Sequence, residues 1–175
     1  YHFFPDLLPG GFVGVDVFFV ISGFLITAHL IDRPPRSGRD LAAFWGRRIR
    51  RLLPASFLVL GTTFVLVLLL APETVRTQTA EQIAASALYV QNWFLAGEAV
   101  DYLAADNAAS PVQHFWSLSV EEQFYLFWPV LVMIVSLAVA RRRLRSLRGG
   151  IGVAVVLMSV ISFSASVVLT ATDPG

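Results

Sequence analysis

His2 is the side chain in this sequence best suited to acid–base chemistry. It precedes a proline- and glycine-rich segment, Pro5–Gly11, which predicts a turn on the outer side of a membrane. Imidazole titrates near neutral pH and can serve as a general base toward a hydroxyl group. The alternative is an interfacial histidine in an aromatic belt, since Tyr1, Phe3 and Phe4 surround it in sequence. The residue alone leaves both interpretations open.

Three carboxylates are further candidates for a site. Asp16 lies in an otherwise uncharged run, and a carboxylate inside a bilayer should face the interior of a helix bundle or water. Glu121 and Glu122 are adjacent in the aromatic-rich segment His114–Pro129. With Ser119 they predict a capping box at a helix start, and beside an outer membrane face they would also suit a sugar site. The alternatives are an arginine partner for the aspartate and a capping role alone for the glutamates.

Four arginines precede an apolar run in the segment Arg47–Pro54, which reads RRIRRLLP. Guanidinium groups bind phosphates through paired N–H donors, so the block predicts an anion site. Clusters of this kind also hold helix ends in the cytoplasm, and that role requires no ligand. From the residues alone the second interpretation is the simpler one.

Several kinds of chemistry are excluded or not indicated. The chain has no cysteine, so a disulfide, a thiolate nucleophile and a cysteine-ligated metal are impossible. His2, His29 and His114 are far apart and match no metal-binding spacing. We therefore predict no metal, no permanently bound cofactor and no nucleic-acid partner.

A lipid bilayer must surround the elements that position these residues. Of the 175 residues 56% are hydrophobic and only 14% are charged, and the charges are confined to short blocks. We expect an all-α, polytopic transmembrane helix bundle with four spanning helices at Phe12–Ile31, Leu52–Ala71, Val120–Ala140 and Ile151–Ala171. The more polar stretch Glu81–Ala96 is too short to cross and predicts one short interfacial or re-entrant helix. Pro129 should kink the third span near Tyr125.

Arginine placement predicts the sidedness of the bundle. All but one of the 13 basic residues lie in the segments Asp32–Arg51 and Arg141–Gly150, which should both be cytoplasmic loops. The connection Pro72–Trp116 contains one arginine and five carboxylates and should lie outside. Because the chain begins without methionine and stops soon after an apolar run, we expect residues 1–175 to be a partial domain, truncated at both ends.

Four of these segments together resemble the acyltransferase 3 family, bacterial multi-pass membrane O-acyltransferases that modify cell-surface polysaccharides. The segments are Tyr1–His2, Gly14–Thr27 (GVDVFFVISGFLIT), Arg47–Ala55 (RRIRRLLPA) and His114–Pro129 (HFWSLSVEEQFYLFWP). The resemblance implies that His2 is the family's essential histidine. It implies that Arg48 and Arg51 are the cytoplasmic pair that handles the acyl-CoA donor. It implies no firm role for Glu121 or Glu122.

The implied activity is acyl transfer across the inner or plasma membrane of the cell. An acyl group, commonly acetyl, would pass from cytoplasmic acyl-CoA, a co-substrate, to a hydroxyl of an extracytoplasmic carbohydrate or similar acceptor. The family has further membrane helices, so this chain alone is expected to be inactive. The alternatives are a transporter or flippase component of the cell envelope and a structural membrane subunit. The acceptor, the acyl chain, the oligomeric state, an additional soluble domain and an acyl-histidine intermediate are not predicted by the sequence.

Overall fold

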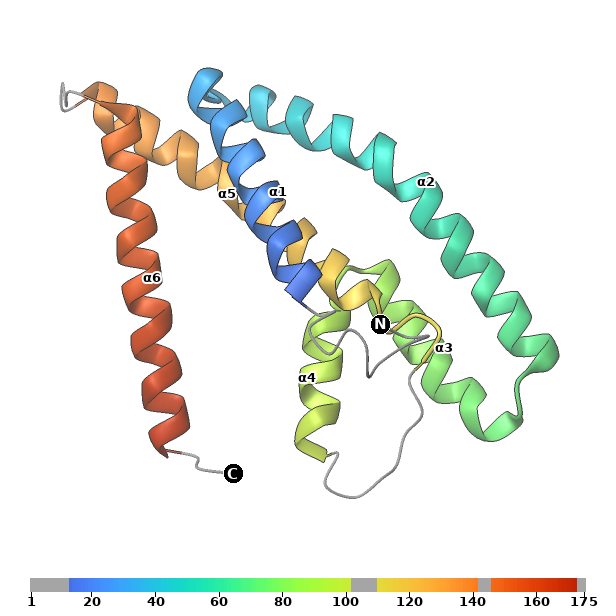
Figure 1. Ribbon diagram of the computed structural model, residues 1–175. Coiled ribbons are helices and arrows are strands. Elements are labelled where there is room, and N and C mark those ends of the chain that lie inside the picture. The colour runs from blue at the N-terminus through green and yellow to red at the C-terminus, as the bar shows by residue number, and fades with distance from the viewer. Residues whose placement is uncertain (1–12, 102–109, 142–145, 173–175) are drawn as a thin grey trace.

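A computed structural model describes residues 13–101, 110–141 and 146–172, which form helices and turns without a strand (Figure 1). The helices are α1 Val13–Asp32, α2 Gly38–Leu70, α3 Glu73–Ala87, α4 Gln91–Asp101, α5 Phe115–Arg141 and α6 Leu147–Thr172. Four of them, α1, α2, α5 and α6, are long and apolar enough to span a bilayer. The prediction of an all-α bundle with four spanning helices is confirmed. The predicted site residue His2 lies outside the described residues.

The central element of the bundle is α5, which contacts all the other described helices. The end of α1, the start of α2, the end of α5 and the start of α6 lie at one end of the bundle, while α3 and α4 lie toward the other (Figure 1). The helix ends beside the two arginine-rich segments are therefore together, which is compatible with two loops on one side of the membrane. Which side that is stays a prediction.

The second helix starts much earlier than predicted, at Gly38 instead of Leu52. A capping box begins it: the Asp40 N–H donates to Ser37 Oγ at 3.4 Å, and the Ser37 N–H donates to Asp40 Oδ2 at 3.0 Å. Arginine, leucine and alanine all favour helix, so the charged block and the apolar run form one helix of 33 residues, about 50 Å long. The prediction that Asp32–Arg51 is a loop is therefore wrong for most of its length.

The sequence predicts one short helix at Glu81–Ala96. The structure instead has the end of α3 and the start of α4 in this stretch. Tyr89 lies between α3 and α4 with φ of 56°, a left-handed conformation that interrupts a right-handed helix. Its carbonyl accepts a hydrogen bond from Gln123 Nε2 at 2.8 Å, which attaches the turn to α5. With 15 and 11 residues, neither helix is long enough to span the membrane. This agrees with the prediction that the stretch makes no single crossing.

The helix that carries the two glutamates also begins earlier than predicted, at Phe115. Ser119 is consequently inside the helix, and its Oγ donates to the Phe115 carbonyl at 2.9 Å. The predicted capping box is wrong because the turn at residues 110–114 already leads the chain into the helix. Glu121 and Glu122 therefore lie in the interior of α5 and not in its first turn.

Pro129 interrupts the hydrogen-bond ladder of α5 at the place where the sequence predicts a kink. Proline has no N–H to donate to the carbonyl four residues earlier, that of Tyr125. Trp45 of α2 replaces the missing donor, since its Nε1 donates to this carbonyl at 3.1 Å. Nearby, Trp128 Nε1 donates to Thr27 Oγ1 of α1 at 2.8 Å. Two indole N–H groups thus join α2 and α1 to α5.

Candidate functional site

The ion pairs found among the described residues meet where α1, α2 and α5 come together. Arg48 donates through Nε to both carboxylate oxygens of Glu122, at 3.0 and 3.2 Å. Its second guanidinium nitrogen, Nη2, lies 3.4 Å from Oε1 of Glu121. The guanidinium carbon is 3.1 Å from the centre of the Tyr125 ring, a cation–π contact. We refer to these four residues and Ser22 as the charged cluster.

Glu121 Oε1 is the atom on which the charged cluster converges. Ser22 Oγ of α1 donates to it at 2.6 Å and Tyr125 Oη donates to it at 2.8 Å. The two hydroxyl groups also contact each other. Glu121 and Tyr125 are only 8% and 5% exposed, and burial strengthens each polar contact. The carboxylate is therefore fixed by three neighbours from three helices.

The charged cluster contains two carboxylates for one guanidinium group. Ionised side chains inside a membrane are costly unless they are paired. Within the part of the chain that the structure describes, Arg48 is the cation found within ion-pair distance of either glutamate. The cluster thus has the composition to bind a second cation or to accept a hydrogen bond from a substrate hydroxyl group. A second cation would balance the surplus negative charge.

The charged cluster brings together three of the predicted site residues, the arginine and both glutamates. Arg51 follows one helical turn later on α2 and is exposed, and Asp16 is exposed on α1. Neither has an ion pair with another described residue. His2 lies outside the described residues, so its place relative to the cluster stays a prediction.

Ser22 and Tyr125 are the members of the charged cluster that sequence reasoning missed. Tyr125 follows Glu121 by four residues, a spacing that places two side chains on the same helix face and could have indicated the contact. Ser22 is 99 residues from Glu121 in sequence, and no local spacing indicates such a contact.

Two cavities adjoin the charged cluster from different sides. One, of about 780 Å³, lies between α2, the α3–α4 turn and α5, has mainly apolar walls and reaches Arg48 and Glu122. The other, of about 230 Å³, lies between α1 and α5 and reaches Ser22 and Glu121. Each cavity therefore ends at a different carboxylate of the cluster. A ligand on either side could contact a charged group without entering the other space.

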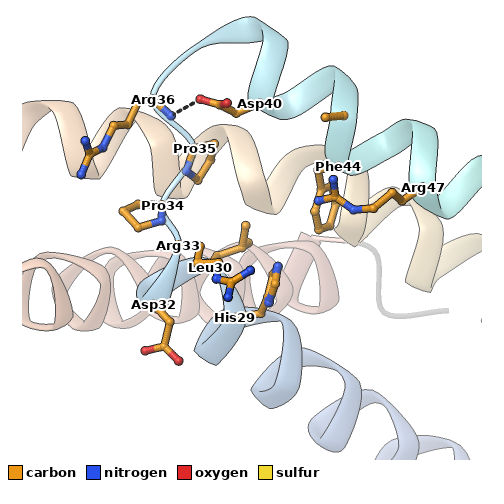
Figure 2. A pocket seen from close by; sticks show the side chains of 11 residues that line it. His29, Leu30, Asp32, Arg33, Pro34, Pro35, Arg36, Asp40, Phe44 and Arg47 are labelled. Atoms are coloured by element: carbon orange, nitrogen blue, oxygen red, sulfur yellow. Dashed lines mark hydrogen bonds between the residues drawn. The ribbon is translucent and has the colours of Figure 1, made fainter.

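A third cavity, of about 690 Å³, lies at the turn between α1 and α2 and is shown in Figure 2. Its walls carry His29, Arg33, Arg36 and Arg47, together with two aspartates. It lies at the end of the bundle where the arginine-rich segments begin. The sequence did not indicate this cavity, because the predicted loop gave no reason for these side chains to converge.

Known proteins match this chain over nearly all its length. A family model described as an acyltransferase domain matches residues 1–173. YrhL of Bacillus subtilis (strain 168), provisionally named a peptidoglycan O-acetyltransferase, is 36% identical over 179 residues, which cover 100% of this chain and 26% of that protein. O-acetyltransferase OatA of Staphylococcus aureus (strain NCTC 8325 / PS 47) is 43% identical over 133 residues, which cover 75% of this chain and 22% of that protein. The chain thus spans about a quarter of the length of these curated relatives. No solved structure matches it significantly.

Proposed function

Because this chain belongs to the acyltransferase domain family, we propose that it forms part of a membrane-embedded O-acyltransferase. The enzyme would move an acetyl group from cytoplasmic acetyl-CoA to a hydroxyl group of an extracytoplasmic carbohydrate. The observation that carries the proposal is the family match over residues 1–173. One similar protein is provisionally named a peptidoglycan O-acetyltransferase, so a peptidoglycan sugar is the acceptor class we propose.

The reaction replaces the C–S bond of a thioester with the C–O bond of an ester. The oxygen of the acceptor hydroxyl attacks the acyl carbon and loses its proton, and the departing sulfur of coenzyme A gains one. We propose that His2 takes the proton from the hydroxyl as general base. The support is its position before the predicted outer turn Pro5–Gly11 and its match to the histidine of the resembling family.

Arg48 and Arg51 are the residues we propose for contact with the donor. They lie one turn apart on α2, so their side chains share one side of the helix. Arg51 is exposed and can meet an anionic group directly. Arg48 is held by Glu121 and Glu122, so a donor oxygen that binds it must compete with a carboxylate. The pair would in this way connect donor binding with the charged cluster.

Replacing His2 by alanine in the full-length protein tests the proposed chemistry. A general base contributes about 10²–10⁴-fold in rate, so acetylation of the external acceptor should fall by that order while the amount of protein in the membrane is unchanged. Added imidazole should restore part of the activity, because it can supply the missing base. Near-normal acetylation by the alanine variant would remove this mechanism and leave an interfacial role for the histidine.

A further inference from the structure

We infer that the cavity between α1 and α2 binds the phosphate groups of the nucleotide part of the acyl-CoA donor. This inference rests on the proposed function and on the predicted cytoplasmic position of this end of the bundle. We refer to the cavity as the turn cavity. Its basic side chains are His29 near the end of α1, Arg33 directly after that helix, Arg36 in the turn, and Arg47 in α2 (Figure 2).

The arginines of the turn cavity are free to bind an anion. Arg33, Arg36 and Arg47 face two aspartates on the same walls, so the site is net positive even with a neutral histidine. Within the described ranges, none of the three arginines has a carboxylate within ion-pair distance. The one neighbouring arginine that is paired, Arg48, points elsewhere. Arg48 is already paired with two carboxylates.

Asp40, one of the two aspartates, is occupied by the cap of α2. Its Oδ2 accepts hydrogen bonds from the N–H groups of Arg36 and Ser37, at 2.9 and 3.0 Å, and from Ser37 Oγ at 2.9 Å. These three hydrogen bonds hold the carboxylate at the helix cap, and it forms no ion pair with the described guanidinium groups. Asp32, the other aspartate, extends away from Phe44 and Arg47 in Figure 2.

The helical geometry of α2 explains why adjacent arginines serve different sites. Successive side chains on an α-helix are rotated by about 100°. Arg47 therefore lines the turn cavity while Arg48 faces α5 and its glutamates. An arginine cluster in a flexible loop would show no such division. Arg47 and Arg48 therefore belong to two different candidate sites.

The backbone of the turn cavity is restrained before any ligand binds. Pro34 and Pro35 fix two consecutive φ angles, and Pro35 is buried. The Arg33 N–H donates to the His29 carbonyl at 3.0 Å, which continues the coil of α1 into the turn. Leu30, 3% exposed, anchors this end of α1 in the apolar core. A restrained site loses less conformational freedom on binding.

The arrangement suits a ligand with several phosphate oxygens. Guanidinium groups recognise phosphates through forked N–H donors, and three of them around one cavity match a di- or triphosphate better than a single carboxylate. The proposed donor carries such a group at its nucleotide end. The phosphates of an anionic lipid headgroup present the same chemistry, so the experiment must separate these two sources.

The test uses the full-length protein in lipid nanodiscs and compares Arg33→Gln/Arg47→Gln with the matched control Arg39→Gln, an exposed arginine of α2 that does not line the cavity. Binding of coenzyme A and the KM for acetyl-CoA are measured in each. We expect the double variant to bind coenzyme A at least about tenfold more weakly. The KM of the double variant for acetyl-CoA should rise by a similar factor while its kcat is unchanged. The control variant should match the wild type in both measurements. Dephospho-coenzyme A should bind the wild-type protein more weakly than coenzyme A does. This comparison requires no variant.

Equal binding by the double variant and the control would overturn the inference. So would a loss that appears only when the nanodiscs contain anionic phosphatidylglycerol, because that result assigns the turn cavity to lipid headgroups. Failure of the proposed function has a different signature. In that case the wild-type protein transfers no acetyl group, and the coenzyme A binding comparison still decides the site. The His2→Ala variant should bind coenzyme A normally in the same assay.

Discussion

Adjacent arginines in the block Arg47–Arg51 have different surroundings, and this is the main finding at the scale of residues. Arg48 is paired with two glutamates and stacks on a tyrosine. Arg47 lines the turn cavity and Arg51 is exposed. The sequence predicts that the block is either an anion site or a cluster that holds a helix end in the cytoplasm. Because it also predicts a loop there, it does not indicate which arginine faces which part of the protein. Once the block is helical, the rotation between successive residues places Arg47 and Arg48 in different environments.

Replacing Arg48 by glutamine should destabilise the full-length protein. The substitution leaves Glu121 and Glu122 without their cation, and removing one partner of a buried ion pair costs about 3–5 kcal/mol. The midpoint of thermal unfolding in detergent should fall accordingly. Adding Glu122→Gln removes one of the two stranded carboxylates and should recover part of the loss. Arg50→Gln, an exposed change on the same helix, is the control and should shift stability by no more than about 0.5 kcal/mol. Equal stability of the Arg48 and Arg50 variants would show that the cluster is not energetically coupled.

At the scale of helices, the sequence located the apolar spans well and their starts poorly. Long uncharged runs identify a span directly, so α1 and α6 lie close to their predicted ranges. The starts of α2 and α5 depend on polar residues that precede the apolar run. Ser37 and Asp40 form a capping box that hydropathy does not detect, while Ser119 resembles a cap but lies inside α5. The charged cluster follows from these extended helix starts, which explains why it could not be predicted.

The attachment of α2 to α5 at Pro129 can be tested by a pair of substitutions. Trp45→Phe removes the indole N–H that bonds the Tyr125 carbonyl. An unsatisfied buried polar group costs about 1–3 kcal/mol, so the unfolding midpoint should drop. Pro129→Ala restores a backbone N–H four residues after Tyr125, so Trp45→Phe should cost less in that background than in the wild type. An equal cost in both backgrounds would show that the tryptophan stabilises the protein by packing alone.

At the scale of the whole molecule, the described helices leave much apolar surface uncovered. Helix α6 packs on α5 near its start, where Ile151 is 3% exposed, and is exposed over most of the rest of its length. Phe163, for example, is 72% exposed. In a bilayer such a surface faces lipid tails or further helices. Because the chain spans about a quarter of its curated relatives, acyl transfer is a proposal for the whole protein.

The proposed function divides the molecule into two sides. The predicted outer side carries His2, and the predicted cytoplasmic side carries the turn cavity with Arg33, Arg36 and Arg47. The charged cluster lies between two cavities within the bundle. The family resemblance carries the functional prediction, because the residues alone are also compatible with a transporter. The structure adds the ion pairs of the charged cluster and the two cavities beside it.

Transfer across a sealed membrane tests the central claim most directly. Full-length protein would be reconstituted in vesicles with labelled acetyl-CoA trapped on the side of the arginine-rich helix ends, and a peptidoglycan fragment added on the other side. We predict that label appears on the added fragment as a base-labile ester, and that His2→Ala abolishes it. Label on the fragment only when donor and acceptor share one compartment, or no label in either arrangement, would contradict acyl transfer through this membrane domain.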